Sequence, residues 1–514
     1  MPNGLTPFAA TLPHRSGSLR TGYRIALACA ALVLISTACY RLLRTPFWSA
    51  NGSRLMPSFA LARGLNYYVV SPPGGPLYSS LYGPMVAIVY LPATLFRSPN
   101  SAVLAGAAIT VVLCFSAAAL LHFAPFKASR GPADVLAFLT AGFLMCFLEP
   151  LKYSCFNNHA DAPGLAFSAA ACAALYPGGP EKWRAALPVS ALCAVLSIFC
   201  KQLFLPVPIA LIVWLWASEG RARAVRYLFW LVAAGVLAGG AALFAAGPAR
   251  LYHCLIWMPT HHPWKDPSRI VSSIQAIRSF IRLSIPVPLL LLACAMYLWP
   301  GRLRGSMLRT LAATRCAPLL LMGVALLPFS IAGHAKIGGD VNNLSLALFF
   351  LACGLTVMLA DVARGAQSGS ARRLAVSVLV ATMLPLALSE APLAFDIRAS
   401  AKRLPQAPQE VAFDYLSRHP GEAYFPWLPL SHLYAEHQFR HEAFGIADRL
   451  LASEPVSMAD FRAYIPPNPR LIAFGDSGTL HVLGYDLMKY LPEYSYQVND
   501  PDLPGWLAYA KSPR

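Results

Sequence analysis

The sequence predicts an all-α polytopic membrane protein with a small mixed α/β domain at its carboxyl end. Of its 514 residues, 57% are hydrophobic and only 12% are charged, a composition too apolar for an ordinary soluble globule. Apolar runs of about 15 to 22 residues recur between residues 24 and 389, close to the length that a helix needs to cross a bilayer. After Ser389 the composition changes and acidic residues become frequent.

The apolar runs are expected to be helices, because lipid cannot satisfy the hydrogen bonds of an irregular backbone. We expect about eleven crossings, at residues 24–43, 101–123, 133–150, 162–177, 186–200, 203–217, 227–247, 286–300, 316–333, 344–361 and 373–389. A further apolar stretch, "YGPMVAIVYLPATLF" at residues 82–96, is short and contains Pro84 and Pro92. We interpret it as an interfacial or re-entrant helix.

The basic residues set the expected topology. They form short clusters between the apolar runs, the pattern typical of cytoplasmic loops: His14, Arg15, Arg20 and Arg24; Lys127 and Arg130; Lys182 and Arg184; Arg221, Arg223 and Arg226; Arg302, Arg304 and Arg309; Arg364, Arg372 and Arg373. The amino terminus is then cytoplasmic and residues 82–96 do not cross, since a full crossing would invert every later basic loop. The net charge of +18 therefore reflects topology and does not indicate a nucleic-acid partner.

Residues 390–514 are expected to form a separate extracytoplasmic domain, after a membrane domain at 1–389. They hold 15 of the 23 acidic residues and 11 of the 41 basic ones. The stretches "QEVAFDYLSRH" and "HEAFGIADRLLA" have helical spacing, whereas "RLIAFG" and "TLHVLGY" are typical of strands. The twelve cysteines mostly lie inside the apolar runs without a CxxC pair, which favours buried hydrophobes over disulfides or metal ligands.

Charged residues are rare in the first 389 residues, and their positions predict a site. Charge at membrane level is costly and usually serves a substrate path or a binding site. Asp161 and Asp340 each directly precede an apolar run on the expected outer face, and Lys201 lies between two runs with almost no loop. We expect the two aspartates to be catalytic and Lys201 to bind substrate. Simple helix caps and a snorkelling lysine remain the alternatives.

Further polar residues on the expected outer face suggest the ligand. Lysines beside exposed backbone amides suit a phosphate, and carboxylates with asparagines suit sugar hydroxyls, so a lipid-linked sugar phosphate fits both. The expected binding residues beside the two aspartates and in the loop "CLIWMPTHHPWKDPSR" are Asn158, His159, Lys336, Asn342, Asn343, His262 and Lys265. The paired histidines lack a third placed ligand, so no metal ligand is assigned; a divalent metal stays open and no other cofactor is expected.

The order of these features resembles the GT-C superfamily of polytopic glycosyltransferases, which includes protein O-mannosyltransferases and aminoarabinose transferases. The resemblance covers roughly residues 20–250, with a looser match through 389. One span precedes a large outer loop with "FALARGLNYY", and "LYSSLYGPMVAIVYLPATLF" is similar to the Tyr-Pro-Pro-Leu interfacial segment of the family. A basic turn and the outward segment "NNHADAPGLAF" follow.

The resemblance implies a polyprenyl-phosphate sugar donor and inverting, direct displacement at the anomeric carbon. It places Tyr82 in the interfacial segment, Asp161 at the family's aspartate in the second outer loop, and Lys201 near the lipid phosphate. The family's general base lies early in the first outer loop, where this chain has Asn51 in "FWSANGSRLMPSF". We expect Tyr82 and Asn51 to bind substrate. Since an amide cannot accept a proton at neutral pH, Asp161 or Asp340 would deprotonate the acceptor while Lys201 and Lys336 stabilise the departing phosphate.

Three functions therefore follow from the sequence. The first is a membrane glycosyltransferase of the bacterial inner membrane that acts on a glycan, lipid or protein acceptor. The second is a catalytically inactive binding or scaffold protein with the same fold, which the amide at position 51 supports. The third is a transporter or flippase of lipid-linked solutes, although such proteins often contain inverted repeats and the sequence has no evident repeat.

Overall fold

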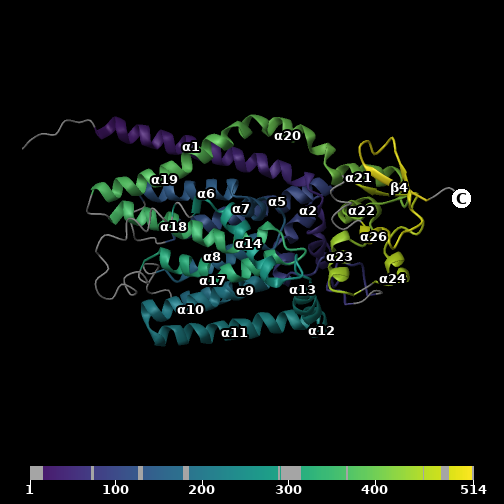
Figure 1. Ribbon diagram of the computed structural model, residues 1–514, viewed down its shortest axis with the longest axis horizontal. Helices are drawn as coiled ribbons and strands as arrows, with labels where there is room; N and C mark the ends of the chain where they lie inside the picture. Colours follow the sequence, from purple (N-terminus) through teal and green to yellow (C-terminus); the bar gives the residue numbers. More distant parts are fainter. Residues whose placement is uncertain are drawn as a thin grey trace, which may run out of the picture.

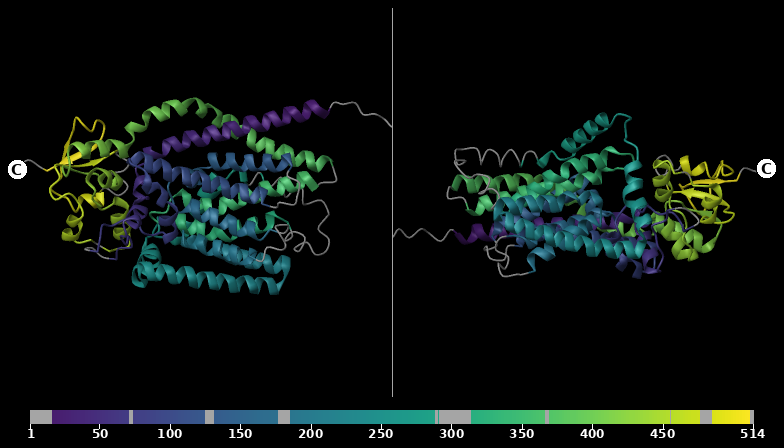
Figure 2. Two further views of the ribbon diagram at one scale, coloured as in Figure 1. Left: turned by 180° about the vertical axis from the view of Figure 1, so that it is seen from behind. Right: turned by 90° about the horizontal axis from the view of Figure 1, so that it is seen from below.

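The computed structural model describes residues 16–70, 74–124, 131–176, 185–287, 290, 314–365, 369–454, 456–475 and 485–511. These residues form an elongated bundle of long helices, with a smaller α/β unit at one end of it (Figure 1). Views from behind and from below show the same division (Figure 2). Short helices from the first half of the chain lie between the bundle and the α/β unit.

Seven helices in the described residues are long and apolar enough to cross a membrane, which indicates an integral membrane protein. They overlap α1 (Ser16–Arg44), α5 (Pro99–Phe123), α10 (Pro206–Glu219), α11 (Arg221–Ala246), α17 (Cys316–Ala335), α18 (Ser345–Gly365) and α19 (Gly369–Glu390). The shorter helices α8 (Asp161–Ala174) and α9 (Ala186–Ile198) pack in the same bundle. All match predicted spans, whereas most of the predicted span at 286–300 lies outside the described residues.

The predicted span at 133–150 differs in the structure. Helix α6 (Pro132–Phe147) ends early, and α7 (Glu149–Phe156) leaves it at an angle of 90°. The break is at Leu148, whose backbone is extended, and Pro150 lies in the first turn of α7, where proline is tolerated. After the bend, α7 packs against residues 341–344 and against α5.

The loops on the side of the α/β unit contain more helix than predicted. Residues 82–96 form α4 (Pro84–Val89) and the 3₁₀ helix η2 (Leu91–Leu95), each too short to cross a bilayer. The first loop contains α2 (Ala50–Ser53) and α3 (Met56–Ala62). The region 248–285, which the predicted spans leave as an outer loop, contains α12 (Pro248–Tyr252), η4 (His253–Trp257), α13 (Met258–His261) and α14 (Arg269–Leu283).

The α/β unit is built on a four-stranded sheet of order β1-β2-β4-β3. The strands β1 (Ala423–Tyr424) and β2 (Leu471–Phe474) are parallel, while β4 (Leu507–Ala510) is antiparallel to both β2 and β3 (Tyr496–Val498). The helices of the unit include α21 (Pro408–Arg418), α22 (Pro429–Glu436), α23 (Ala443–Leu451), α24 (Met458–Ala463) and α26 (Tyr485–Met488). Helix α20 (Ile397–Arg403) packs against α1 beside the bundle (Figure 1). The helical prediction for 409–419 and 441–452 and the strand prediction for 470–475 are confirmed; "TLHVLGY" falls almost wholly outside the described residues.

This unit has a hydrophobic core of its own, which includes Tyr415, Phe425, Phe461 and Ile472. Val69 and Leu77 of the first loop belong to the same core, so the loop packs against the α/β unit. The backbone confirms this contact, because Glu442 N donates to Leu77 O over 3.0 Å. The packing places the segment around Ser79 and Tyr82 between the bundle and the α/β unit.

Candidate functional site

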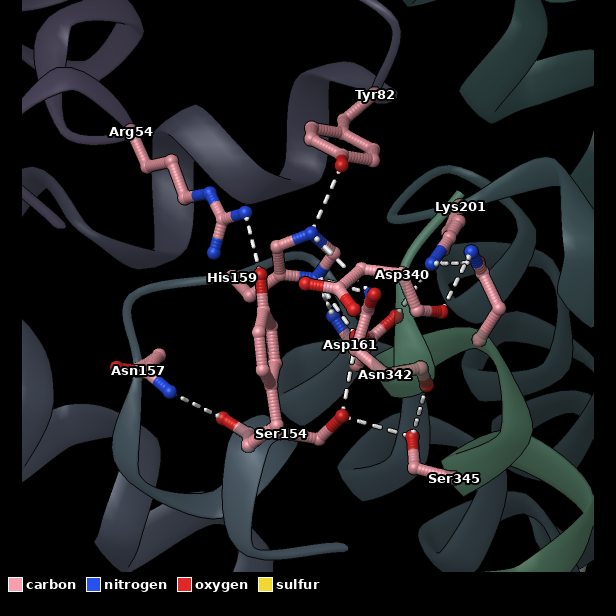
Figure 3. A network of polar contacts seen from close by, with 12 residues as sticks. Arg54, Tyr82, Ser154, Asn157, His159, Asp161, Lys201, Asp340, Asn342 and Ser345 are labelled. Atoms are coloured by element: carbon pink, nitrogen blue, oxygen red, sulfur yellow. Dashed lines mark hydrogen bonds and ion pairs between the residues drawn. The ribbon is translucent and has the colours of Figure 1, made fainter. Parts of the chain in front are cut away.

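A buried ion pair between Asp161 and Lys201 lies at the centre of the candidate site (Figure 3). Asp161 is the first residue of α8, and Lys201 occupies the turn between α9 and the 3₁₀ helix η3 (Gln202–Phe204). Lys201 Nζ donates to Asp161 Oδ1 over 2.7 Å, and the exposed fractions of the two residues are 5% and 0%. Because a charge without a partner is very costly at such depth, each side chain requires the other.

Neighbouring side chains satisfy the remaining atoms of the pair. Asn342 Nδ2 donates to Asp161 Oδ2 over 2.7 Å, and Ser154 Oγ donates to the same oxygen over 3.1 Å. Lys201 Nζ also donates to Asn343 Oδ1 over 2.8 Å. Both asparagines lie in the 3₁₀ helix η5 (Val341–Leu344) and Ser154 lies in α7. Segments far apart in the sequence therefore meet at a single carboxylate.

His159 connects this pair to a tyrosine. His159 Nδ1 lies 2.7 Å from Asp161 Oδ2, and the Tyr82 hydroxyl lies 2.8 Å from His159 Nε2. The carboxylate can only accept a hydrogen bond, so His159 carries its proton on Nδ1 and Tyr82 donates to Nε2. Tyr82, His159 and Asp161 thus form a chain of oriented hydrogen bonds.

The electrostatics favour a neutral imidazole beside a charged pair. Burial lowers the pKa of His159 from 6.5 to about 4, against the opposing influence of Asp161. Burial alone would raise the pKa of Asp161, but the hydrogen bond from His159 and the ammonium of Lys201 hold it well below its usual range. Burial lowers the pKa of Lys201, while Asp161 opposes this shift. At neutral pH we therefore assign Asp161 as carboxylate, Lys201 as ammonium and His159 as neutral.

Arg54 supplies a second cation beside the same residues. Its Nη2 donates to the Tyr153 hydroxyl over 2.8 Å, and its guanidinium lies 4.5 Å from the ring centre of Trp48. Its Nη1 is buried and has no hydrogen-bond partner in the described part of the chain. Arg54, Tyr82, His159 and Ser79 line a small cavity of about 20 Å³, room for about one water molecule. A buried donor without a partner indicates that a ligand or water completes this site.

The α/β unit contributes two carboxylates behind the cavity. Ser79 Oγ donates to Asp448 Oδ2 over 2.8 Å, and Ser79 N lies 3.4 Å from Glu442 Oε2. Burial raises the pKa of Asp448, and it raises the pKa of Glu442 from 4.5 to about 8. Glu442 Oε1 is buried without a partner in the described residues. Ser79 thus links the cavity wall to both acids.

The structure brings together six of the residues predicted from the sequence: Asp161, Lys201, His159, Asn342, Asn343 and Tyr82. Asp340 lies two residues from Asn342 but is exposed, and its carboxylate accepts from Val341 N over 2.6 Å as the cap of η5. The interpretation as a helix cap therefore describes the geometry of Asp340, whereas the buried Asp161 makes side-chain contacts that a cap alone does not require.

Three other predicted binding residues make their contacts outside the Asp161 cluster. Lys336 Nζ donates to Pro259 O over 2.8 Å and to Thr260 O over 3.1 Å. His262 Nε2 contacts Asp448 O over 3.2 Å, at the α/β unit. Lys265 N donates to Ala335 O over 3.0 Å, and burial lowers the pKa of its side chain. These residues brace the loop 253–268 against α17 and α23.

Asn51 and Asn158 hold the loop that carries His159. Asn51 Oδ1 accepts from Asn158 N over 2.9 Å, and Asn51 Nδ2 donates to Thr45 O over 2.9 Å and to Asn157 Oδ1 over 3.0 Å. Asn158 Nδ2 donates to Asn51 O over 3.2 Å. A carboxylate at position 51 could not donate these two bonds, so the amide suits a scaffolding position.

The described residues contain no group of three or more histidine, cysteine, aspartate or glutamate side chains that could hold a metal ion. The oxygens of Asp161 are already bonded to Lys201, Asn342, Ser154 and His159. This donor set does not fit a metal, and we derive no step through one.

Sequence reasoning missed Arg54, Tyr153, Glu442 and Asp448. Arg54 could have been found, because it follows Asn51 closely in the first outer loop. A cation in that loop lies on the same expected outer face as Asp161 and Lys201. Glu442 and Asp448 gave no signal, since acidic residues are common throughout residues 390–514. Their burial depends on the docking of the α/β unit onto Ser79.

No protein-family model and no curated protein sequence matches the chain. Among solved structures, the chain is similar to the crystal structure of ArnT from Cupriavidus metallidurans bound to undecaprenyl phosphate, with 13% sequence identity and a TM-score of 0.53 over 96% of this chain and 100% of that chain. ArnT in the apo state matches with 12% identity, the same TM-score and the same coverage. Since ArnT is a GT-C aminoarabinose transferase, the chain has a GT-C-like fold over almost its whole length, as the sequence resemblance predicted.

Proposed function

We propose that the protein is a membrane glycosyltransferase that moves a sugar from a polyprenyl-phosphate donor to an acceptor outside the cytoplasm. The observation that carries the proposal is the buried Asp161–Lys201 pair, with the partnerless Nη1 of Arg54 at the adjoining cavity. The GT-C-like fold supports it, because the similar ArnT structure holds undecaprenyl phosphate.

On the donor side, two cations suit the leaving phosphate. Arg54 Nη1 is free to donate to an anion, and Lys201 adds positive charge beside it. As the bond between the anomeric carbon and the phosphate oxygen breaks, its electron pair passes to that oxygen. Cations held in place before the reaction stabilise this developing charge without reorganisation.

On the acceptor side, we propose that Asp161 acts through His159. His159 lines the cavity and is neutral, so its Nε2 can take the proton of an acceptor hydroxyl once the Tyr82 hydroxyl turns aside. The adjacent Asp161 carboxylate then stabilises the imidazolium, as in other aspartate–histidine pairs. The acceptor oxygen forms the new bond to the anomeric carbon as the phosphate leaves. Asp340 is the alternative base, since it is exposed near the same loop.

The proposal includes a topology. The amino terminus is cytoplasmic, the chain makes about eleven crossings of the bacterial inner membrane, and residues 390–514 form an extracytoplasmic domain. The cluster around Asp161 then lies at the outer rim of the bilayer, where a lipid-linked donor presents its phosphate. The short α4 and η2 at 82–96 support a segment that does not cross.

A catalytically inactive binding protein is the second candidate, because the amide of Asn51 has a purely scaffolding set of contacts. Comparison of cell-envelope glycans with and without the protein tests the choice. A glycan modification that disappears with the gene and returns with the wild type, but not with His159→Gln, supports the transferase. Unchanged glycans together with retained binding of polyprenyl phosphate support the binding protein. Movement of an unmodified lipid-linked solute across vesicles supports the transporter.

A further inference from the structure

A polar groove, separate from the cavity beside His159, lies between the last turn of α1 and helix α7. Its open volume is about 270 Å³, and its lining includes Arg41, Arg44 and Lys152 against a single carboxylate, Glu149. The arginines come from α1 and the lysine from α7, which turns away from α6 by 90°. The groove is therefore assembled from separate elements and is not a face of one helix.

The groove contains one more positive charge than the protein neutralises. Arg41 Nη2 donates to both carboxylate oxygens of Glu390, over 2.7 and 2.6 Å, and Lys152 pairs with Glu149. Arg44 is exposed and forms no ion pair within the described residues; its guanidinium lies 4.9 Å from the ring centre of Phe47. The Nε of Arg41 is buried and also lacks a partner in that part of the chain. Arg44 and the Nε of Arg41 are therefore available to an anion, and the Lys152 ammonium, which has three donors, can add a bond besides its pair with Glu149.

A simpler explanation covers only part of this arrangement. Cations in the last turn of a helix complement its dipole, and arginines at the end of a span snorkel toward water. This accounts for the presence of Arg44. It accounts neither for the buried, partnerless Nε of Arg41 nor for the convergence of Lys152 from another helix.

The position of the groove identifies the source of the anion. The candidate span Thr21–Phe47 includes Arg44 in its last residues, so the groove lies at the depth of lipid headgroups. Anions at this depth are mainly lipid phosphates, which attract basic side chains near the membrane surface. The groove has the size of a headgroup, below the usual range of about 300–1,000 Å³ for sites that enclose a whole small molecule.

We propose that Arg44, Lys152 and Arg41 Nε bind the phosphate of an anionic lipid in this groove. Tyr153 forms part of the groove wall and accepts a hydrogen bond from Arg54 through its hydroxyl. The bound headgroup therefore lies one aromatic ring away from the cavity beside His159. Lipid binding in this groove does not depend on the transferase activity, so an experiment can refute one proposal without refuting the other.

The test measures lipid retention by native mass spectrometry of the full-length protein from bilayer nanodiscs. The probes are dioleoyl phosphatidylglycerol and the zwitterionic dioleoyl phosphatidylcholine. We expect the wild type to retain phosphatidylglycerol preferentially, and Arg44→Gln/Lys152→Gln to reduce that retention by about tenfold, since two charge-assisted bonds are lost. Arg97→Gln is the matched control, because Arg97 is also exposed but lies outside the groove.

Equal retention of the two lipids by the wild type, or equal losses in the Arg97 control and the double variant, would overturn the proposal. Inorganic phosphate is added in a separate arm. Displacement of phosphatidylglycerol by millimolar phosphate would assign the groove to a free anion and contradict the lipid source. If the double variant does not fold, Arg44→Gln alone replaces it, because Arg44 forms no ion pair in the described structure; retention equal to the wild type would then count against the proposal.

Discussion

Lys201 Nζ donates to Asp161 Oδ1 over 2.7 Å inside the protein, where neither side chain has appreciable contact with solvent. Within the described residues, every other polar partner of the pair is an uncharged side chain: Asn342, Asn343, Ser154 or the neutral His159. The lysine is thus the cation that allows a carboxylate to remain charged at this depth. The ion pair therefore holds the first turn of α8 against the turn that precedes α10.

Breaking this pair destabilises the protein strongly. Lys201→Met leaves the Asp161 carboxylate without a cation and costs about 3–5 kcal/mol, the usual cost of an uncompensated buried charge. Asp161→Asn/Lys201→Met removes both charges and recovers part of the loss. Thermal unfolding in detergent measures each variant. Unfolding of Lys201→Met at the temperature of the wild type would show that the pair is not buried as described.

Acidification weakens the fold through His159. Its pKa of about 4 lies below the value of 6.5 expected when unfolded, so the unfolded state binds more protons between these values. The stabilisation is fully present above pH 6.5 and is lost as the pH falls toward 4. His432 and His441 in the α/β unit shift in the same direction, so the difference between wild type and His159→Gln isolates the effect. A difference in unfolding temperature that stays constant from pH 8 to pH 4 would contradict it.

Glu442 has the opposite dependence on pH. Burial raises its pKa from 4.5 to about 8, so the wild type loses stability as the pH rises from about 4.5 through 8. Glu442→Gln removes the ionisable group and should make the variant more stable than the wild type above pH 8, with the gap closing below pH 5. Unfolding temperatures at pH 5 and pH 9 provide the comparison. If Glu442→Gln is destabilised equally at both pH values, Glu442 contributes by packing and its ionisation does not affect stability.

Close packing beside Lys201 should make Gly164 intolerant of a side chain. A Cβ at Gly164 in α8 would lie 2.1 Å from the ring of Phe204, three residues after Lys201. Gly164→Ala should therefore cost about 1–3 kcal/mol by overpacking and displace the turn that carries the lysine. Gly240→Ala in α11 is the control, because nothing lies within 4 Å of its added Cβ; it should stabilise the helix by about 0.5–1 kcal/mol. Equal stability of the two variants would contradict the described packing.

The membrane helices were predictable from the sequence because an apolar run of the right length has few other structures open to it. The bend at Leu148 was not recognised, although Pro150 marks it, since hydropathy alone runs on through residue 150. The region 248–285 was predicted as a loop because its helices are short or polar. Helix α14 is amphipathic, so the helical spacing of its apolar residues predicts it, whereas their number does not.

The candidate site was partly predictable for a similar reason. Asp161 and Lys201 stood out because charges are scarce in the apolar half, and the structure places them in contact. Lys336 and Asp340 were equally prominent, but proximity in the chain does not fix the partners of a side chain: Lys336 donates to the carbonyl oxygens of Pro259 and Thr260, and the Asp340 carboxylate caps η5. Arg54, Glu442 and Asp448 depend on contacts between the first loop and the α/β unit, which no local pattern encodes.

The most direct measurement of the central claim is turnover of a labelled polyprenyl-phosphate sugar by the purified protein in lipid nanodiscs, with an envelope extract as acceptor source. We predict release of polyprenyl phosphate together with transfer of the label, a loss of at least about a hundredfold in His159→Gln and Arg54→Gln, and wild-type rates in Arg97→Gln. Two results would contradict the account. The first is that the folded wild type binds the donor lipid but releases no polyprenyl phosphate. The second is full activity in both the His159 and the Arg54 variants.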